Sequence, residues 1–326
     1  MKPFVVVTGA AGMIGSGVVR ALNDCGVTDL LLVDDLKQGQ KWKNLVGKQF
    51  SSLISKRSLL SFLQGKQDLV QAIIHLGACS STIEIDADYL WENNTRYTIS
   101  LAEWALTHGK RFVYASSAAT YGDGSCGFDD NHDALSTLRP LNMYGYSKHA
   151  VDLWMKKENV LHLVCGLKYF NVFGPNEYHK GPMASMVMKM CHKAHTEGRI
   201  GLFRSNDPAR FKDGDQVRDF IYIKDAASWT ACLIDPKWRH VCGIYNIGSG
   251  QTTTWNRLAL ALFQALGRAP TIEYIPMPEA LTNQYQNYTC ASMEKLRKIF
   301  PDVRAMNVEH SIADYVTNYL LPQAYW

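Results

Sequence analysis

The sequence predicts an α/β fold, a doubly wound parallel sheet of the Rossmann type with a smaller C-terminal lobe. Two observations support this prediction. Short apolar runs alternate with helical patterns over the first half of the chain, and a glycine-rich turn follows the first run. Such alternation is typical of βαβ units, whose strands pair in parallel.

Five apolar runs in the first half predict the strands of this sheet. They are apolar throughout, as is usual for parallel strands that are buried on both faces. They lie at residues 4–9, 30–35, 72–78, 111–117 and 163–170. Apolar residues at helical spacing, each series ending at a glycine, predict helices over 12–26 and 89–109.

The regular alternation of strand and helix patterns ends after residue 170, where the predicted loops are longer. Further elements are predicted at 218–234 (strand and helix), 241–248 (strand), 252–267 (helix) and 271–276 (strand). We therefore expect residues 1–170 to form the nucleotide-binding domain, together with a returning segment around 217–248. Residues 171–326 would mainly form a substrate-binding lobe.

The composition is that of a soluble globular protein, with 47% hydrophobic and 20% charged residues among 326. The net charge is +4 without a basic run, so no nucleic-acid partner is predicted. No apolar run approaches the roughly 20 residues of a membrane helix, and the N-terminus does not resemble a secretory signal. The eight cysteines form no CxxC pair, so we expect free thiols, no metal site and a cytoplasmic location.

A dinucleotide signature follows the first strand. In "TGAAGMIG", Gly9, Gly12 and Gly15 have the spacing GxxGxxG and open a helix. Such glycines let the backbone approach a pyrophosphate at a helix N-terminus. Asp34 and Asp35 end the second strand, where a contact to the adenosine ribose is expected.

The residues themselves leave the choice between NAD and NADP open. An acid at the strand end favours the free ribose hydroxyl of NAD. Lys41 and Lys56 follow and could pair with the additional phosphate of NADP, or be solvated surface lysines.

A catalytic pair is predicted in "NMYGYSKHA". Tyr144 and Lys148 are four residues apart and share one helix face. A nearby ammonium and a positive nicotinamide would lower the phenol pKa from about 10, as a base requires. Tyr146 points elsewhere and is expected to pack. Ser117 ends the fifth strand, beside the expected nicotinamide.

These motifs resemble the extended short-chain dehydrogenase/reductases that act on nucleotide sugars and, more narrowly, the ADP-heptose 6-epimerases. The resemblance covers nearly the whole chain and rests on "GACSST", "NNTRY", "ASSAATYG", "PLNMYGYSK", "KYFNVFGPNEYHKGPMAS", "RDFIYIKD", "YNIGSG" and "IEYIP". It implies inversion of carbon 6 of ADP-D-glycero-β-D-manno-heptose through a 6-keto intermediate, for the lipopolysaccharide inner core. It also implies bound NADP and a ring-like homo-oligomer, usually a pentamer.

The resemblance assigns residue roles. Tyr144 and Lys180 match the two proton acceptors, Lys148 the lysine on the cofactor ribose, and Ser117 the serine that polarises the reacting oxygen. Further NADP contacts match Met13, Ile14, Asp34, Asp35, Lys41, Lys56, Leu76, Gly77, Ala78, Cys79, Ser80, Asn93 and Val172. Substrate contacts match Asn171, Phe203, Arg204, Ser205, Asn206, Arg218 and Tyr285.

The chain departs from the family pattern at several substrate positions and at one cofactor position. Pro182 and Lys189 stand where a substrate-contacting Ser and His are usual, and Leu76 and Arg204 each replace an acid. The loop 207–217 is longer than expected. These departures concern the fit of the substrate rather than the chemistry.

Three other functions remain open. A dehydratase would need an acid pair beside Ser117, where Ala118 and Ala119 stand instead. A ring 4-epimerase would need no counterpart of Lys180. A cofactor-binding sensor without catalysis would not need Ser117, Tyr144 and Lys148 together.

Overall fold

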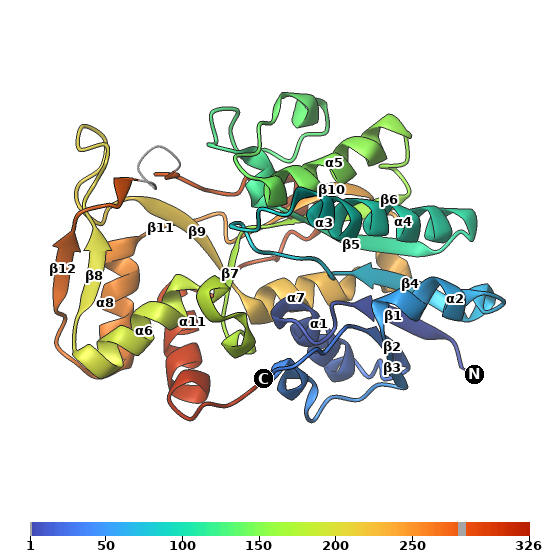
Figure 1. Ribbon diagram of the computed structural model, residues 1–326, viewed down its shortest axis with the longest axis horizontal. Helices are drawn as coiled ribbons and strands as arrows, with labels where there is room; N and C mark the ends of the chain where they lie inside the picture. Colours follow the sequence, from blue (N-terminus) through green and yellow to red (C-terminus); the bar gives the residue numbers. More distant parts are fainter. Residues whose placement is uncertain (1, 280–284) are drawn as a thin grey trace.

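The structure is a computed structural model that describes residues 2–279 and 285–326 (Figure 1). Its centre is a seven-stranded sheet with the order β10-β6-β5-β4-β1-β2-β3, in which every paired strand is parallel. The strands are β1 (Phe4–Thr8), β2 (Leu30–Val33), β3 (Ser52–Ile54), β4 (Val70–His75), β5 (Arg111–Ser117), β6 (Val164–Tyr169) and β10 (Gly243–Ile247). The predicted doubly wound fold is confirmed.

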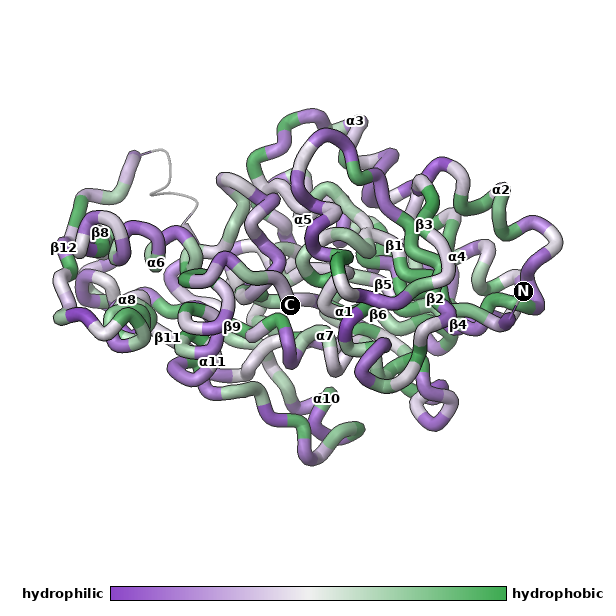
Figure 2. Tube along the Cα trace, turned by 90° about the horizontal axis from the view of Figure 1, so that it is seen from below, coloured by the Kyte–Doolittle hydropathy of each residue, from purple (hydrophilic) through white to green (hydrophobic). Residues whose placement is uncertain are grey.

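Helices cover both faces of this sheet (Figure 1). They are α1 (Met13–Asp24), α2 (Leu59–Leu63), α3 (Ala87–Leu90), α4 (Tyr97–Thr107), α5 (Met143–Lys157) and α7 (Ile223–Cys232). Val6 and Ile73 pack in one core cluster with α4 and α5, whereas Val5 and Val7 pack in another with α1 and α7. Alternate residues of a strand face opposite sides, so burial on both faces explains why the strand sequences are mostly apolar. Figure 2 shows these hydrophobic strands at the centre of the sheet.

The remaining elements form smaller sheets beside the main one. Strands β7 (Asn171–Phe173), β9 (Val217–Tyr222) and β11 (Thr252–Thr254) form a three-stranded sheet, and β8 (Ile200–Phe203) pairs with β12 (Ile272–Ile275). They pack with α6 (Met186–Glu197), α8 (Trp255–Ala265) and α11 (Val308–Tyr315), while α10 (Glu294–Ile299) packs near β10. The strand predicted after residue 217 therefore lies outside the main sheet, whereas α7 and β10 return to it.

One predicted helix is interrupted. The segment expected as a helix over 89–109 consists of α3, a π-helical stretch Trp91–Arg96, and α4. Wide turns of this kind often occur at functional sites, and Asn93 lies within this one. No helix in the described parts of the chain is long and apolar enough to cross a membrane.

Candidate functional site

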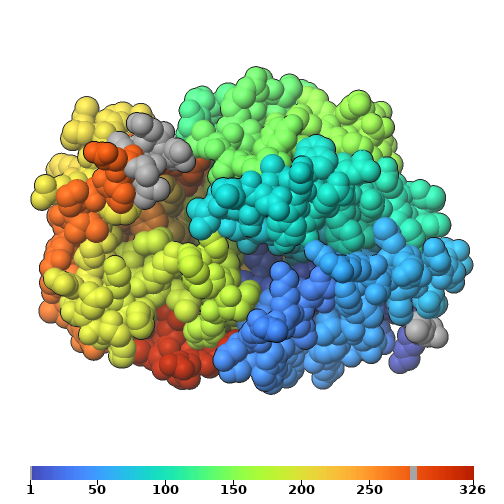
Figure 3. Space-filling model, viewed as in Figure 1, coloured from blue at the N-terminus to red at the C-terminus, as the bar shows by residue number. Residues whose placement is uncertain are grey.

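A cavity of about 430 Å³ opens at the carboxyl ends of β1, β2, β4, β5 and β6. The strand order reverses between β1 and β4, and ligands of open α/β sheets bind at such a switch point. Figure 3 shows a hollow where the N-terminal segment (blue), the segment around residue 90 (teal) and the segment around residue 175 (yellow-green) meet.

The glycine turn at the floor of this cavity leaves no room for side chains. Gly9 has φ 65°, and a Cβ there would lie 2.7 Å from the Cα of Gly77. A Cβ on Gly15 would lie 2.0 Å from the carbonyl oxygen of Gly9. Gly12 caps α1 without a side-chain hydrogen bond, and the first turn carries no acid. The helix N–H groups are therefore open to an anion, which fits the pyrophosphate of a dinucleotide.

Acids and lysines surround the far end of the cavity. Asp34 accepts hydrogen bonds from the backbone N–H of Ala11 at 2.8 Å and from Lys41 Nζ at 2.6 Å. Lys56 Nζ donates to Asn93 Oδ1 at 2.5 Å and lies 4.0 Å from Asp35. This end therefore holds two cations beside two carboxylates, a donor set that can address both a ribose hydroxyl and a phosphate.

The cavity is lined by all of the predicted catalytic residues and by all of the predicted cofactor residues except Cys79. The lining also includes residues that the sequence did not single out, namely Thr8, Val33, Lys37, Tyr89, Tyr97, Ala115, Ser116, Tyr169, Phe170 and His179. Of these, only His179 could have been predicted from the sequence, because it directly precedes Lys180. Nothing in the sequence indicated a role for Tyr89 or Tyr97, since helical periodicity does not distinguish an aromatic side chain that lines a cavity from one that packs in the core.

The catalytic pair lies at the start of α5. The side chain of Asn142 caps this helix by accepting from the N–H of Gly145 at 2.8 Å, so Tyr144 stands in the first turn. Tyr144 shares a hydrogen bond with Ser117, the last residue of β5. Lys148 is buried one turn further on and donates to the carbonyl oxygen of Ala115 at 2.8 Å.

Burial is the largest cause of the pKa shifts of this pair. Burial raises the pKa of Tyr144 above its ordinary value, and the hydrogen bond with Ser117 offsets only part of that rise. Burial also lowers the pKa of Lys148 to about 8, against a smaller opposing effect of Asp152. Lys148 is not among the causes of the Tyr144 shift, so the predicted lowering by the ammonium together with a positive nicotinamide stays a prediction.

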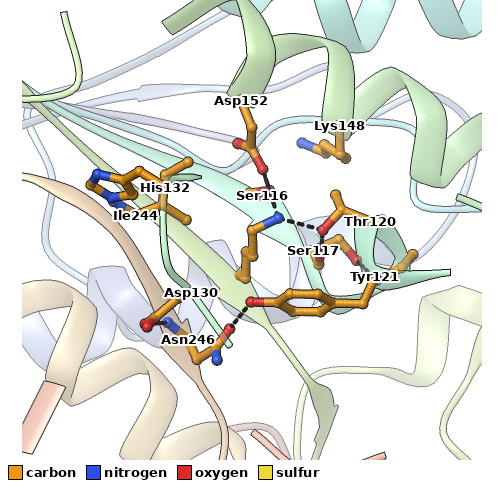
Figure 4. A network of polar contacts seen from close by, with 12 residues as sticks. Ser116, Ser117, Thr120, Tyr121, Asp130, His132, Lys148, Asp152, Ile244 and Asn246 are labelled. Atoms are coloured by element: carbon orange, nitrogen blue, oxygen red, sulfur yellow. Dashed lines mark hydrogen bonds and ion pairs between the residues drawn. The ribbon is translucent and has the colours of Figure 1, made fainter. Parts of the chain in front are cut away.

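A buried ion pair lies close to Lys148 (Figure 4). Asp152 and Lys168 are 2.9 Å apart, and neither side chain is exposed. Asp152 also accepts from Ser116 Oγ at 2.7 Å, while Lys168 donates to the hydroxyl of Thr120, which in turn donates to the Ser117 carbonyl oxygen at 2.8 Å. This network fixes the backbone on both sides of the serine in the cavity.

Lys180 enters the same cavity from a loop. It belongs to a 3₁₀ turn over Tyr178–Met183, in which Gly181 has φ 50°. Burial lowers the pKa of Lys180, and the carboxylate of Glu177 partly opposes this. The structure therefore brings Tyr144 and Lys180 to one cavity from different elements.

The predicted substrate residues lie outside this cavity. Arg218, nearly buried, lies over the rings of Tyr285 at 4.9 Å and Trp255 at 5.7 Å. No carboxylate among the described residues pairs with it. Phe203 meets Tyr285 edge to face at 6.3 Å. A buried guanidinium without an acid suits an anionic ligand.

The other predicted substrate residues make mainly local contacts. Lys189 Nζ donates to the carbonyl oxygen of Pro182 at 2.5 Å, so the two departures from the family pattern touch each other. Asn171 donates to the Asp219 carbonyl oxygen at 2.8 Å. Residues 204–206 lead from β8 into the long loop, whose Asp213 accepts from the N–H of Ser205 at 2.8 Å.

Comparisons with known proteins agree with this geometry. Residues 5–248 match the model of the NAD dependent epimerase/dehydratase family. The chain is 47% identical to an ADP-L-glycero-D-manno-heptose-6-epimerase of Nitratidesulfovibrio vulgaris, covering 97% of each chain. It is 42% identical to the protein of that name from Fusobacterium nucleatum, covering 97% of this chain and 98% of the relative. The crystal structure of the Helicobacter pylori protein of that name matches with a TM-score of 0.80 and 26% identity, over 97% and 96% of the two chains.

The sheet, the glycine turn and the serine–tyrosine–lysine group together define a dinucleotide-dependent enzyme of the doubly wound α/β class. The chain belongs to the NAD dependent epimerase/dehydratase family and, within it, to the ADP-L-glycero-D-manno-heptose-6-epimerase family.

Proposed function

We propose that this epimerase inverts carbon 6 of ADP-D-glycero-β-D-manno-heptose, to give the L-glycero epimer, with bound NADP. The observation that supports this most directly is the meeting of Tyr144 and Lys180 in one cavity beside the dinucleotide turn. An enzyme with one proton-handling group would not need the second. Their arrival from α5 and from a separate loop suits two positions of the reacting oxygen.

The chemistry of carbon 6 explains that need. Its C–H bond has no neighbouring carbonyl and is too weak an acid for a protein base. When bound, the nicotinamide supplies reversible hydride transfer, which interconverts the alcohol and a 6-keto intermediate. Inversion then requires the ketone to present its other face, most simply by rotation about C5–C6, which moves its oxygen across the cavity.

The protein groups handle the proton at each oxygen position. A donor must lie within about 3 Å of its acceptor, so one tyrosine cannot serve both positions. We assign Tyr144, assisted by Ser117, to one orientation and Lys180 to the other, with Lys148 on the cofactor ribose. The only carboxylates among the described lining residues are Asp34 and Asp35, on the cofactor side. Elimination of water beside Ser117 is therefore disfavoured.

NADP is favoured over NAD by the cations at the far end of the cavity. Lys41 and Lys56 line it together with Asp34, Asp35 and Asn93. Lys41 already compensates the carboxylate that would otherwise repel a phosphate. The preference is supported by charge, because a ribose hydroxyl alone would need no lysine.

The nucleotide end of the substrate is assigned to the smaller sheets. Arg218 is nearly buried, lies over the rings of Tyr285 and Trp255, and pairs with no carboxylate among the described residues, which supports binding of the diphosphate. A cytoplasmic location and a ring-like homo-oligomer, usually a pentamer in this family, remain predictions.

The test is incubation of the purified protein with ADP-heptose, followed by NMR of the configuration at carbon 6. We expect epimerisation without added cofactor if NADP copurifies. In D₂O, carbon 6 should carry no deuterium, because the same hydride returns. Stoichiometric deuterium there would exclude the redox route, and inversion of a ring carbon instead would exclude the assigned substrate position.

A further inference from the structure

The loop that carries Lys180 is attached to the rest of the molecule through Asn176. This asparagine is fully buried and has φ 73°. Its amide donates to Ser16 Oγ and to the carbonyl oxygen of Trp326, both at 3.0 Å, and accepts from the N–H of Trp326 at 2.9 Å. Its own carbonyl oxygen accepts from Asn44 at 3.0 Å. One residue thus connects the loop to helix α1 and to residues far away in the sequence.

The last residues of the chain hold the other side of this junction. A Cβ on Gly17 of α1 would lie 3.1 Å from the ring of Trp326, so the ring packs directly on that helix. Lys48 Nζ donates to the Trp326 carbonyl oxygen at 2.5 Å. The hydroxyl of Tyr178 donates to the carbonyl oxygen of Ala324 at 3.2 Å, and its ring meets Tyr325 edge to face at 5.1 Å.

A third contact fixes the loop beyond Lys180. Glu177 is fully buried, and its carboxylate accepts from the N–H of Ser185 at 2.5 Å, from Ser185 Oγ at 2.6 Å and from the hydroxyl of Tyr315 at 2.9 Å. The backbone is therefore tied on both sides of Lys180. Because the turn between these ties has no long regular element, only such contacts set where the ammonium lies.

We propose that residues 324–326 form a clamp that, through Asn176, positions the Lys180 loop against the cofactor-binding helix α1. Asn176 is a positioning residue, which acts on the reaction only through Lys180. The inference rests on the proposed role of Lys180 as the second proton-handling group. The clamp matters because a misplacement of about 1 Å at a reacting group can cost roughly a hundredfold in rate.

The direct test is Asn176→Gly, which keeps a residue suited to positive φ but removes all three side-chain hydrogen bonds. We expect kcat to fall roughly 10–100-fold, with NADP affinity nearly unchanged. The matched control is Asn23→Ala, since Asn23 also donates twice, to Val27 and Gln49, and accepts once, from Gln49. That junction does not touch the loop, so its loss should lower thermal stability without lowering kcat.

A double-mutant cycle separates positioning from general destabilisation. If Asn176 acts through Lys180, Asn176→Gly should cause little further loss in a Lys180→Met background. Equal, additive losses in both backgrounds would overturn the clamp while leaving the role of Lys180 intact. An unimpaired Lys180→Met single variant would instead overturn the proposed second proton-handling group. If Asn176→Gly does not fold, Tyr178→Phe, which removes only the hydroxyl on Ala324 and Tyr319, gives the same cycle.

Discussion

The two walls of the cavity are built in different ways. The sheet wall consists of strand ends and helix starts, and it presents the three glycines of the turn, Ser117, Tyr144 and Lys148. The loop wall, residues 171–183, presents Val172, His179 and Lys180 from a short strand and a 3₁₀ turn. Regular elements hold the first wall, whereas contacts to residues 44 and 326 hold the second.

The two walls differ in how far apart in the sequence the residues lie that position their functional groups. On the sheet wall, hydrophobic periodicity predicts the strand ends and the first helix start, and the spacing of four residues predicts that Tyr144 and Lys148 share a helix face. On the loop wall, position depends on partners 132 and 150 residues away. The first wall should therefore respond to substitution within its own motifs, and the second to substitutions elsewhere in the chain.

The largest expected effect is at the tyrosine of the sheet wall. Tyr144→Phe should lower turnover roughly 10²–10⁴-fold, as is typical for loss of one proton-transfer group. Tyr146→Phe is the control, because that side chain is exposed and stacks on Trp91 at 6.3 Å, outside the cavity. Steady-state kinetics of both variants would check this, and comparable losses in the two would refute the assignment of Tyr144.

Much of the sheet wall could be predicted from the sequence alone. The apolar runs marked the strands, and the glycine spacing and the YxxxK spacing placed their residues in one cavity. Lys180 could be assigned only from the resemblance to a family, because a lysine between glycines and prolines has no periodicity. Asn176 was not anticipated, since nothing near it in the sequence indicates its bonds to Ser16 and Trp326. The division of the chain near residue 170 stays a prediction.

The pKa expectation shows another limit of sequence. Helical spacing correctly placed Lys148 near Tyr144, but not the direction of its ammonium, which donates to the Ala115 carbonyl oxygen. Spacing gives proximity, whereas burial is the largest cause of the pKa shifts of both Tyr144 and Lys148.

The second prediction tests how rigid the glycine turn is. Gly15→Ala should lower the free energy of unfolding by about 3 kcal/mol, the upper end for overpacking, because its Cβ would meet backbone rather than a movable side chain. Gly201→Ala is the control, since the nearest atom to its Cβ would be in Ile275, at 3.4 Å. Urea unfolding of both variants is the measurement. A loss of less than about 0.5 kcal/mol for Gly15→Ala, the size of a neutral surface change, would mean that the turn adapts.

The third prediction concerns acid stability of the sheet wall. His75 is fully buried between the hydroxyls of Thr8 at 2.7 Å and Thr98 at 2.9 Å. Burial, with a smaller effect of Lys148, lowers the pKa of His75 to about 3. Unfolding raises it to about 6.5, so between these values only the unfolded chain binds the proton. Stability attributable to His75 is therefore complete above pH 6.5 and falls as the pH falls.

The expected loss is roughly 2–3 kcal/mol between pH 6.5 and pH 4.5, from about 1.4 kcal/mol per pH unit. Urea unfolding at both pH values, for the wild type and His75→Gln, measures it. Between pH 6.5 and pH 4.5, the free energy of unfolding of His75→Gln should fall by about 2–3 kcal/mol less than that of the wild type. Parallel losses would show that other groups cause the acid sensitivity.

The smallest expected effect tests whether the cofactor end of the sheet wall selects its ligand by charge. Lys41 bonds Asp34 at 2.6 Å and is only partly exposed. Its removal leaves the Asp34 carboxylate uncompensated, which repels a phosphate but can still accept from a ribose hydroxyl. We expect Lys41→Ala to weaken NADP binding about tenfold, as for one charge-assisted hydrogen bond, and NAD binding much less.

Lys43→Ala is the control, since Lys43 lies in the same 3₁₀ turn but does not line this cavity. Titration calorimetry with both cofactors gives the comparison. Equal weakening of NADP and NAD would mean that Lys41 holds the turn in place rather than contacting the phosphate, so that this end of the sheet wall, like the loop wall, is positioned by hydrogen bonds to other segments.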